Sequence, residues 1–123
     1  MDQKIGVRSH AAHPTWPVPG SVGRWESDLD QLARIAETHV GPLLIAGDFN
    51  ATRYNTQFRS ILDRGGLVDA TYGVNGTWPS DWWPILGAQI DHVLVSADIR
   101  VVTAGSLKIS GSDHRAVYTE IAR

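Results

Sequence analysis

Polar side chains that could bind a metal ion or a phosphate directly follow an apolar run of strand length, residues 43–46. Gly47 ends the run, and Asp48 and Asn50 come next at a spacing of two residues. In an extended chain such residues lie on one face, so the carboxylate and the amide would leave the strand end pointing the same way. The alternative is a turn in which Asp48 and Asn50 bond their own backbone.

A second carboxylate stands inside a strongly apolar stretch, residues 88–96. Burying the Asp91 carboxylate there is costly unless it has a partner, so we expect it to be paired. His92 follows it and should point to the opposite face of the strand, where we expect it to pack.

Two more polar interruptions lie beside predicted strands: Asp113 and His114 just before the last one, and His10 at the end of the first. A carboxylate behind a histidine holds the ring in one tautomer and stabilises its protonated form, which suits it to a phosphate oxygen. Carboxylate and carbonyl oxygens suit a hard cation such as Mg²⁺ or Mn²⁺.

The composition limits the other classes of function. With 123 residues we expect one domain over residues 1–123, and a net charge of −2 argues against a broad duplex-binding surface. Cysteine is absent, which removes disulfides and thiolate metal sites from consideration. We find neither an apolar run of membrane-spanning length nor a signal-peptide pattern, so we expect the chain as given to be soluble, with its localisation undetermined.

Periodicity predicts the order β-α-β-α followed mostly by strands, which is an α/β fold with helices on one face of a mixed sheet. The expected strands are residues 4–10, 43–46, 67–70, 88–96, one or two within 99–109 broken near Gly105, and 116–121. The expected helices run from Ser21 or Ser27 to about Thr38, and from Asn55 or Thr56 to Gly65.

The long loop over residues 73–87 carries Trp78, Trp82 and Trp83. These rings could stack on a substrate, bind a carbohydrate or peptide, or cover part of a sheet or a partner surface, and we favour covering. In the earlier loop, His13 could serve the loop structure or the substrate edge.

Taken together, these motifs resemble the endonuclease/exonuclease/phosphatase family of Mg²⁺-dependent phosphoesterases, over nearly the whole chain and in the order of the C-terminal half of that domain. The matching stretches are Ser9-His10 with Pro14, Gly47 to Asn50, Ile90 to Ser96, and Ser112 to Val117.

The resemblance implies in-line attack of water on a phosphoester, with a Mg²⁺ or Mn²⁺ cofactor. It implies that Asp48 activates the water and that Asn50 holds the phosphate or the metal's water shell. It further implies that Asp113 helps ligate the metal, with Asp48 and Asn50 beside it. His114 would donate to a phosphate oxygen, oriented by Asp91, and a second phosphate contact would come from His10. The substrate type, whether nucleic acid, nucleotide, phospholipid or inositol phosphate, is left open.

The sequence departs from the family in size, since members are roughly twice as long for a two-sheet domain. Their first half supplies a metal-binding Asn and Glu that have no place here, and Glu26, in the first predicted helix, does not match. Half of a four-layer α/β/β/α sandwich would expose a large apolar face, so we expect a second copy to complete it as a homodimer. The alternatives are a fragment of a longer protein and a non-catalytic half-domain that acts in assembly or binding.

Overall fold

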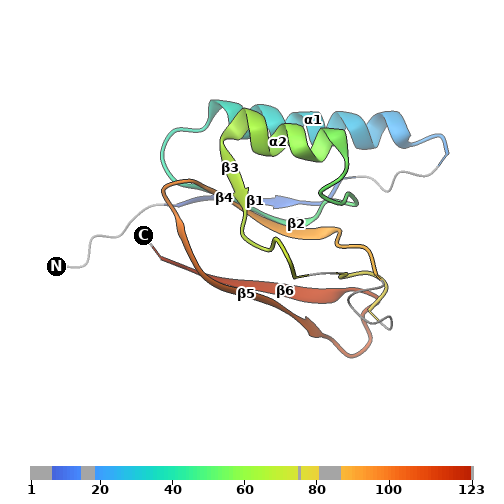
Figure 1. The fold of residues 1–123 in the computed structure, drawn as a ribbon. Coiled ribbons are helices and arrows are strands. Elements are labelled where there is room, and N and C mark those ends of the chain that lie inside the picture. Colours follow the sequence, from blue (N-terminus) through green and yellow to red (C-terminus); the bar gives the residue numbers. More distant parts are fainter. Residues whose placement is uncertain (1–6, 15–18, 75, 81–86, 123) are drawn as a thin grey trace.

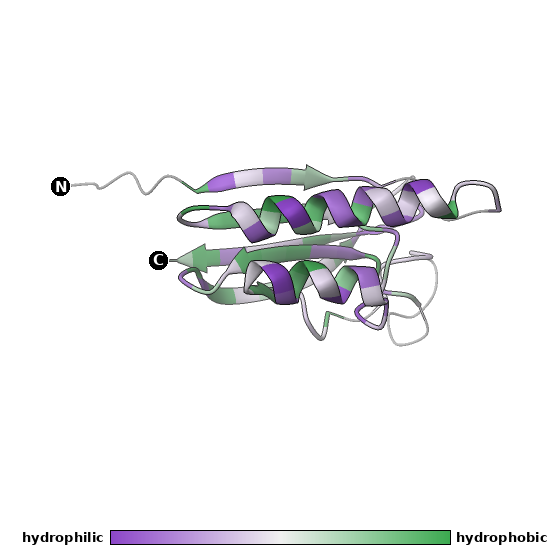
Figure 2. Cartoon of the chain, turned by 90° about the horizontal axis from the view of Figure 1, so that it is seen from above, coloured by the Kyte–Doolittle hydropathy of each residue, from purple (hydrophilic) through white to green (hydrophobic). Residues whose placement is uncertain are grey.

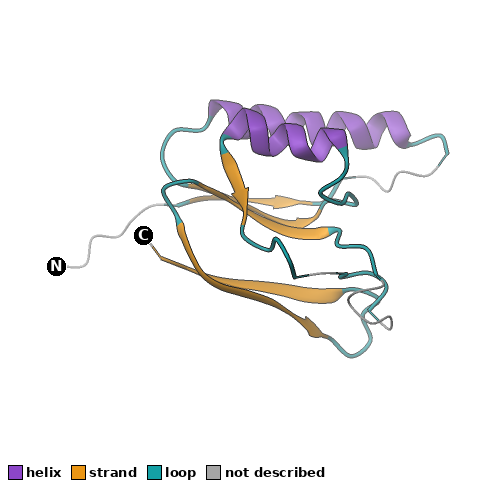
Figure 3. Ribbon diagram, in the orientation of Figure 1, coloured by secondary structure: helices purple, strands orange, loops and turns teal. Residues whose placement is uncertain are grey.

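The computed structural model describes residues 7–14, 19–74, 76–80 and 87–122, and it has three layers (Figure 1). Two helices cover one face of a four-stranded sheet, and a two-stranded sheet lies on the other side, as the secondary structure in Figure 3 shows. In chain order the elements are β1 (Arg8–Ala12), α1 (Val22–Thr38), β2 (Leu43–Asp48), α2 (Thr56–Gly65), β3 (Leu67–Asp69), β4 (Asp91–Ser96), β5 (Arg100–Lys108) and β6 (Arg115–Ala122).

Both helices are amphipathic, and hydrophobic and hydrophilic residues alternate along them in Figure 2. They bury an apolar stripe against the sheet; its fully or nearly fully buried members are Trp25, Leu29, Ala33, Ala36, Phe58 and Ile61. The second helix begins at a side-chain cap, because Asn55 Oδ1 accepts from the Phe58 amide at 2.8 Å. It ends at Gly66, whose left-handed backbone is the usual helix stop.

The four-stranded sheet is mixed and has the order β1-β2-β4-β3. β1 and β2 run parallel, whereas β4 runs antiparallel to both β2 and β3. The carboxyl ends of β1 and β2 therefore meet the amino end of β4 at one edge of the sheet. The mixed sheet with helices on one face confirms the predicted fold class.

Residues of β4 alternate between two hydrophobic clusters. Leu94 belongs to the cluster under the helices, while Val93 and Val95 belong to the cluster that β5 and β6 cover. The same alternation sends Asp91 toward the two-stranded sheet and His92 toward the helices. His92 is 1% exposed, so the prediction that it packs in the interior is confirmed.

Two strand predictions were wrong in detail. The first strand extends to Ala12, so His10 lies inside it and not at its end. β5 is a single strand that runs unbroken through Gly105, and the irregularity in its pairing lies between Val101 and Thr103. The glycine at position 105 leaves room for the ring of Tyr118 on the paired strand, which a Cβ there would displace.

No helix among the described residues is long and apolar enough to cross a membrane. Trp82 and Trp83 lie outside the described residues, so the prediction that they cover a sheet stands as a prediction.

Candidate functional site

Two carboxylates lie opposite each other at the edge where β2 ends and β4 begins. Asp48 is the last residue of β2, Asp91 is the first of β4, and the two are register partners in the antiparallel pair. Like charges directly opposite on neighbouring strands destabilise a sheet. This edge therefore needs a cationic group close by.

His114 supplies that group from the loop that leads into β6. Its Nδ1 lies 2.8 Å from Asp91 Oδ2, and its Nε2 lies 3.6 Å from Asp48 Oδ2. The Asp91 contact is a hydrogen bond, whereas the separation from Asp48 is too long for one. Because Nδ1 is engaged by Asp91, Nε2 is the ring atom that faces Asp48 and the pocket.

A short segment of the Trp-rich loop holds His114 in place. The Thr77 carbonyl accepts from the Arg115 amide at 2.7 Å, and Ser80 donates through its amide to the Asp113 carbonyl at 2.7 Å. The buried Thr77 hydroxyl also accepts from the Asp91 amide at 3.2 Å. Thr77 thus ties the backbone of Asp91 to the backbone that carries His114.

The backbone has unusual geometry at the end of β2 and in the turn that follows it. Gly47 has φ 146°, and a Cβ there would collide with the Ala12 carbonyl oxygen, so only glycine fits beside β1. Asn50 has φ 50°, a left-handed conformation that is uncommon outside glycine. The Asn50 amide donates to Asp48 Oδ1 at 2.8 Å, which is the Asp-turn bond that the sequence left open. The turn and the site are therefore the same structure.

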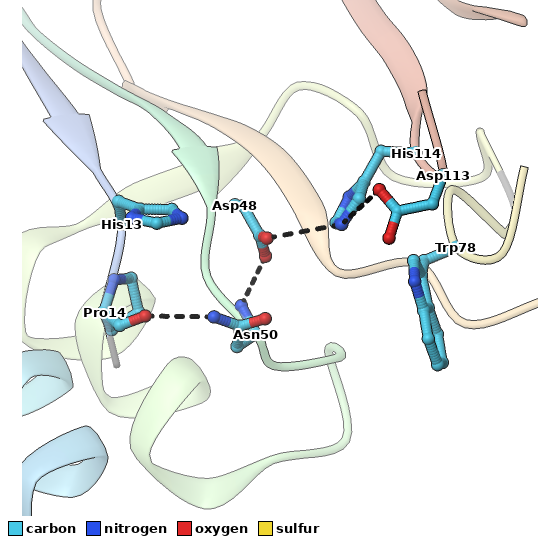
Figure 4. A pocket seen from close by; sticks show the side chains of 7 residues that line it. All are labelled: His13, Pro14, Asp48, Asn50, Trp78, Asp113 and His114. Carbon is cyan, nitrogen blue, oxygen red and sulfur yellow. Dashed lines mark hydrogen bonds and ion pairs between the residues drawn. The ribbon is translucent and has the colours of Figure 1, made fainter. Parts of the chain in front are cut away.

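These side chains line a pocket of about 560 Å³, within the usual size of a ligand site. Its lining residues, shown in Figure 4, are His13, Pro14, Asp48, Asn50, Trp78, Asp113 and His114. Asp91 stands behind His114, and Asp113, with a side chain 79% exposed, lies 4.0 Å from His114 Nε2. The structure thus brings together four predicted site residues in the lining, with Asp91 behind them.

The structure does not bring His10 into this pocket. His10 is the register partner of Ile45, which belongs to the core under the helices, and partners in a parallel pair point to the same face. The imidazole that reaches the pocket from this part of the chain is His13, just after β1. In Figure 4 its ring lies on the opposite side of Asp48 from His114.

The sequence left His13 open between the loop and the substrate edge, favoured a covering role for Trp78, and gave no role to Thr77. The alternation of β1 could have indicated His13, because its odd-numbered residues face away from the helices and His13 continues that series. Using it required knowing that the strand extends to Ala12. Nothing in the sequence placed Trp78 at the pocket or buried Thr77 beneath it.

The electrostatics of the pocket follow from burial and crowding. Burial raises the pKa of Asp48 above its usual value, and the charge of Asp91 acts in the same direction, against the Asn50 amide and two imidazoles. Burial alone would lower the pKa of His114, but the hydrogen bond and charge of Asp91, with Asp48 and Asp113, raise it above its usual value. His114 is thus favoured in its protonated form.

The residues present fit a divalent cation. Ligand atoms of Asp48, Asp91 and His114 lie within 4.8 Å of one another. Asn50 Nδ2 donates to the Pro14 carbonyl at 3.0 Å, while Asn50 Oδ1 is buried and has no hydrogen-bond partner in the described structure. A buried acceptor of this kind needs a donor or a cation, and an oxygen-rich donor set is the kind that Mg²⁺ and Mn²⁺ prefer.

Comparison with known proteins gives a match to a protein family. The model of the Endonuclease/Exonuclease/phosphatase family matches residues 3–114. No curated protein sequence matches the chain.

Solved structures of similar fold span about twice its length. A mannosyl-6-phosphatase of Bacteroides thetaiotaomicron VPI-5482 aligns with a TM-score of 0.72 and 18% identity, covering 94% of this chain and 51% of that one. A conserved protein of unknown function from Enterococcus faecalis V583 aligns with a TM-score of 0.69 and 21% identity, over 93% and 49% of the two chains. An endonuclease/exonuclease/phosphatase from Beutenbergia cavernae DSM 12333 aligns with a TM-score of 0.66 and 22% identity, over 94% and 35%. At these identities the likeness shows the fold, and this chain matches between 35% and 51% of each structure.

Proposed function

Because the chain belongs to the endonuclease/exonuclease/phosphatase family, we propose that its pocket hydrolyses a phosphoester with the help of Mg²⁺ or Mn²⁺. The observation that carries the proposal is the position of His114 between two carboxylates. Its Nδ1 lies 2.8 Å from Asp91 Oδ2, and its Nε2 lies 3.6 Å from Asp48 Oδ2. Its outer end opens on a pocket large enough for a substrate phosphate. A bound divalent cation would offset the negative charge that builds on the phosphoryl oxygens.

His114 is the donor to a phosphate oxygen in this proposal. Asp91 holds Nδ1, which orients the ring and leaves Nε2–H directed into the pocket. The raised pKa of His114 favours the imidazolium, which donates from both nitrogens, so within the cluster of Asp48, Asp91 and His114 the carboxylates would be the ligands of a cation. The ring therefore suits an anionic substrate better than it suits the cation.

Asp48 and Asn50 are placed to serve the water and the cation. Asp48 is held at the end of β2 by its bond from the Asn50 amide, and its second oxygen faces His114. It would orient or deprotonate the attacking water. Asn50 offers its Oδ1, which has no hydrogen-bond partner among the described residues, and Asp113 offers an exposed carboxylate at the pocket rim. Together with Asp48 they would hold the cation directly or through its water shell.

His13 takes the place that the sequence gave to His10. It lines the pocket, and its charge is one of those that oppose the rise in the pKa of Asp48. We assign it the second phosphate contact.

A second copy of the chain is our proposed cover for the open side of the molecule. Four large hydrophobic side chains of β5, β6 and the connection between them are 45% or more exposed: Val102, Leu107, Ile109 and Tyr118. They lie in a chain that accounts for about half of its solved relatives. A twofold pairing would bury them and rebuild a two-halved sandwich from one sequence. Size-exclusion chromatography with light scattering tests this, and a monomer at micromolar concentration would contradict it.

The activity is tested with bis(p-nitrophenyl) phosphate and p-nitrophenyl phosphate while Mg²⁺ or Mn²⁺ is titrated. We expect cation-dependent hydrolysis that falls sharply in Asp48→Ala and His114→Ala but not in Asp63→Ala, which removes an exposed carboxylate from α2. Comparing His13→Ala with His10→Ala tests the choice of histidine, since only the first should weaken substrate binding.

Equal rates in the parent and in the site variants would remove the enzymatic proposal. The alternative function, a half-domain that acts in assembly or binding, would then stand. What favours that alternative is coverage, because the chain spans only about half of its solved relatives.

A further inference from the structure

A second carboxylate–imidazole pair lies on the helix-facing side of β4, directly behind the pocket. His92 Nδ1 lies 2.9 Å from Asp69 Oδ2, and the two side chains are 1% and 7% exposed. Proposed catalysis does not use either residue. A buried ion pair is weak evidence for stability by itself, which raises the question of what this one does.

The hydrogen bonds of His92 point to the turn that carries Asn50. Nε2 lies 2.9 Å from the Ala51 carbonyl, and since a carbonyl only accepts, this nitrogen carries the proton and donates. Nδ1 then shares its proton with Asp69, whose other oxygen accepts from the Thr71 amide at 2.9 Å and the Thr71 hydroxyl at 2.6 Å. Both oxygens of the Asp69 carboxylate take part in hydrogen bonds, so the ring is held in one orientation.

The same ring also packs on the residue before Asn50. The centroids of His92 and Phe49 are 5.6 Å apart in an edge arrangement, and His92 lies 4.3 Å from the ring of Phe58. Both phenylalanines are fully buried. His92 therefore contacts both chain neighbours of Asn50, one through its ring face or edge and one through a hydrogen bond.

The backbone of Asn50 is in the left-handed region, with φ 50°. Asparagine enters this region more readily than other residues with a Cβ, and contacts that hold its chain neighbours stabilise the conformation further. The conformation lets the Asn50 amide reach Asp48 and leaves the buried Oδ1 as an open acceptor at the pocket.

We propose that His92 is a positioning residue of the pocket, which locks Phe49 and Ala51 and so fixes Asn50 for the cation or phosphate. The proposal rests on the function proposed above, because it matters only if Asn50 serves that ligand. Residues on both faces of β4 would then support the pocket: Asp91 orients His114 on the pocket face, and His92 holds Ala51 on the helix face.

The test replaces the hydrogen bonds while keeping a ring. His92→Phe preserves aromatic packing with Phe49 and Phe58 but cannot donate to Ala51, whereas His92→Gln keeps a donor. Phe58→Leu is the matched control, because it disturbs the same cluster without removing the bond to Ala51. Hydrogen exchange at the Asn50 amide is measured without metal, and Mn²⁺ binding is measured by water-proton relaxation.

We expect His92→Phe to speed exchange at the Asn50 amide and to weaken Mn²⁺ binding by about 10- to 100-fold, the usual effect of losing an outer-shell contact. His92→Gln should restore much of both, and Phe58→Leu should leave both near parent values. Parent-like exchange in His92→Phe, or equal losses in His92→Phe and Phe58→Leu, would overturn the proposal.

Two features keep this test separate from that of the proposed function. Exchange at Asn50 reports positioning even if the parent binds no Mn²⁺, a result that would count against the proposed function alone. If His92→Phe does not fold, His92→Gln and the parent still decide. If His92 and the metal site are coupled, the coupling acts in both directions. Binding of Mg²⁺ must then slow solvent exchange of the His92 ring proton in the parent. An unchanged ring proton alongside a slowed Asn50 amide would overturn the inference.

Discussion

β4 contributes one residue to each of two carboxylate–imidazole pairs. The pairs lie on opposite faces of the strand, and their surroundings differ. Asp91 and His114 lie at 2.8 Å with side chains 14% and 24% exposed, and Nε2 of that histidine faces an open pocket. Asp69 and His92 lie at 2.9 Å with side chains 7% and 1% exposed, and both ring nitrogens are occupied by protein acceptors. The same two groups at nearly the same distance therefore have different capacities.

The difference shows that the role of such a pair depends on whether its outer ring nitrogen already has a protein hydrogen-bond partner. A pair whose outer nitrogen meets solvent can pass a hydrogen bond to a substrate, whereas a pair closed by Ala51 and Thr71 can only hold backbone in place. A similar contrast separates Asp69 of the closed pair from Asp48, the carboxylate that faces His114 of the open pair. Burial outweighs the neighbours of Asp48 and raises its pKa, but for Asp69 the bonds from His92 and Thr71 outweigh burial and lower the pKa.

The largest expected effect separates the pairs by activity. His114→Ala should lower cation-dependent hydrolysis by about 10³-fold, because it removes the donor to the phosphate. Its unfolding free energy should change by less than about 1 kcal/mol, since the site is partly exposed. Steady-state kinetics and urea unfolding measure the two quantities, and a large stability loss with retained activity would reverse the assignment.

The closed pair should show the opposite pattern. Asp69→Ala removes one partner of a buried pair and leaves His92 and Thr71 without their acceptor, so we expect a loss of about 3–5 kcal/mol in unfolding free energy. Urea unfolding at neutral pH measures it. A loss no larger than that of His114→Ala would show that the pairs do not differ in structural weight.

Acid should weaken the closed pair in a defined direction. Because the folded-state pKa of Asp69 is lowered from its usual 3.8, its stabilising contribution is present above pH 3.8 and is lost as pH falls through the folded-state pKa. Asp69→Asn has no such proton to gain. The difference in unfolding free energy between parent and Asp69→Asn should therefore shrink on acidification, as urea titrations at neutral and acidic pH would show, and a constant difference would contradict the assignment.

The smallest expected effect has the opposite sign and concerns Asp48, which faces His114 of the open pair. The pKa of Asp48 is raised, so the folded state disfavours its charged form at neutral pH. Asp48→Asn should gain roughly 0.5–1 kcal/mol in unfolding free energy while hydrolysis is lost, a trade-off common at functional sites. Thermal unfolding at pH 7 measures the gain, and destabilisation would show that the ion pair with His114 matters more than burial and the charge of Asp91.

The sequence predicted the parts of the site that depend on local order. The apolar run before Gly47, the carboxylate inside an apolar strand and the alternation at Asp91 and His92 all reflect the two-residue period of a strand. That period was enough to send Asp91 to a partner and His92 to the interior, as the structure shows. The amphipathic helices were predicted on the same basis, since their spacing is also local.

Register was beyond the reach of the sequence. The end of β1 decides which histidine faces the pocket, because a shift of one residue moves a side chain to the other face of the sheet. The sequence therefore proposed His10 for the site and left His13 open, whereas His13 lines the pocket. Pairing across long separations likewise placed Thr77 under Asp91 and Asp69 beside His92. Composition and periodicity determined the α/β class and the motif residues, because they act between near neighbours. Only the tertiary structure decided which imidazole meets which carboxylate, because that depends on strand register and on packing between residues far apart in the chain.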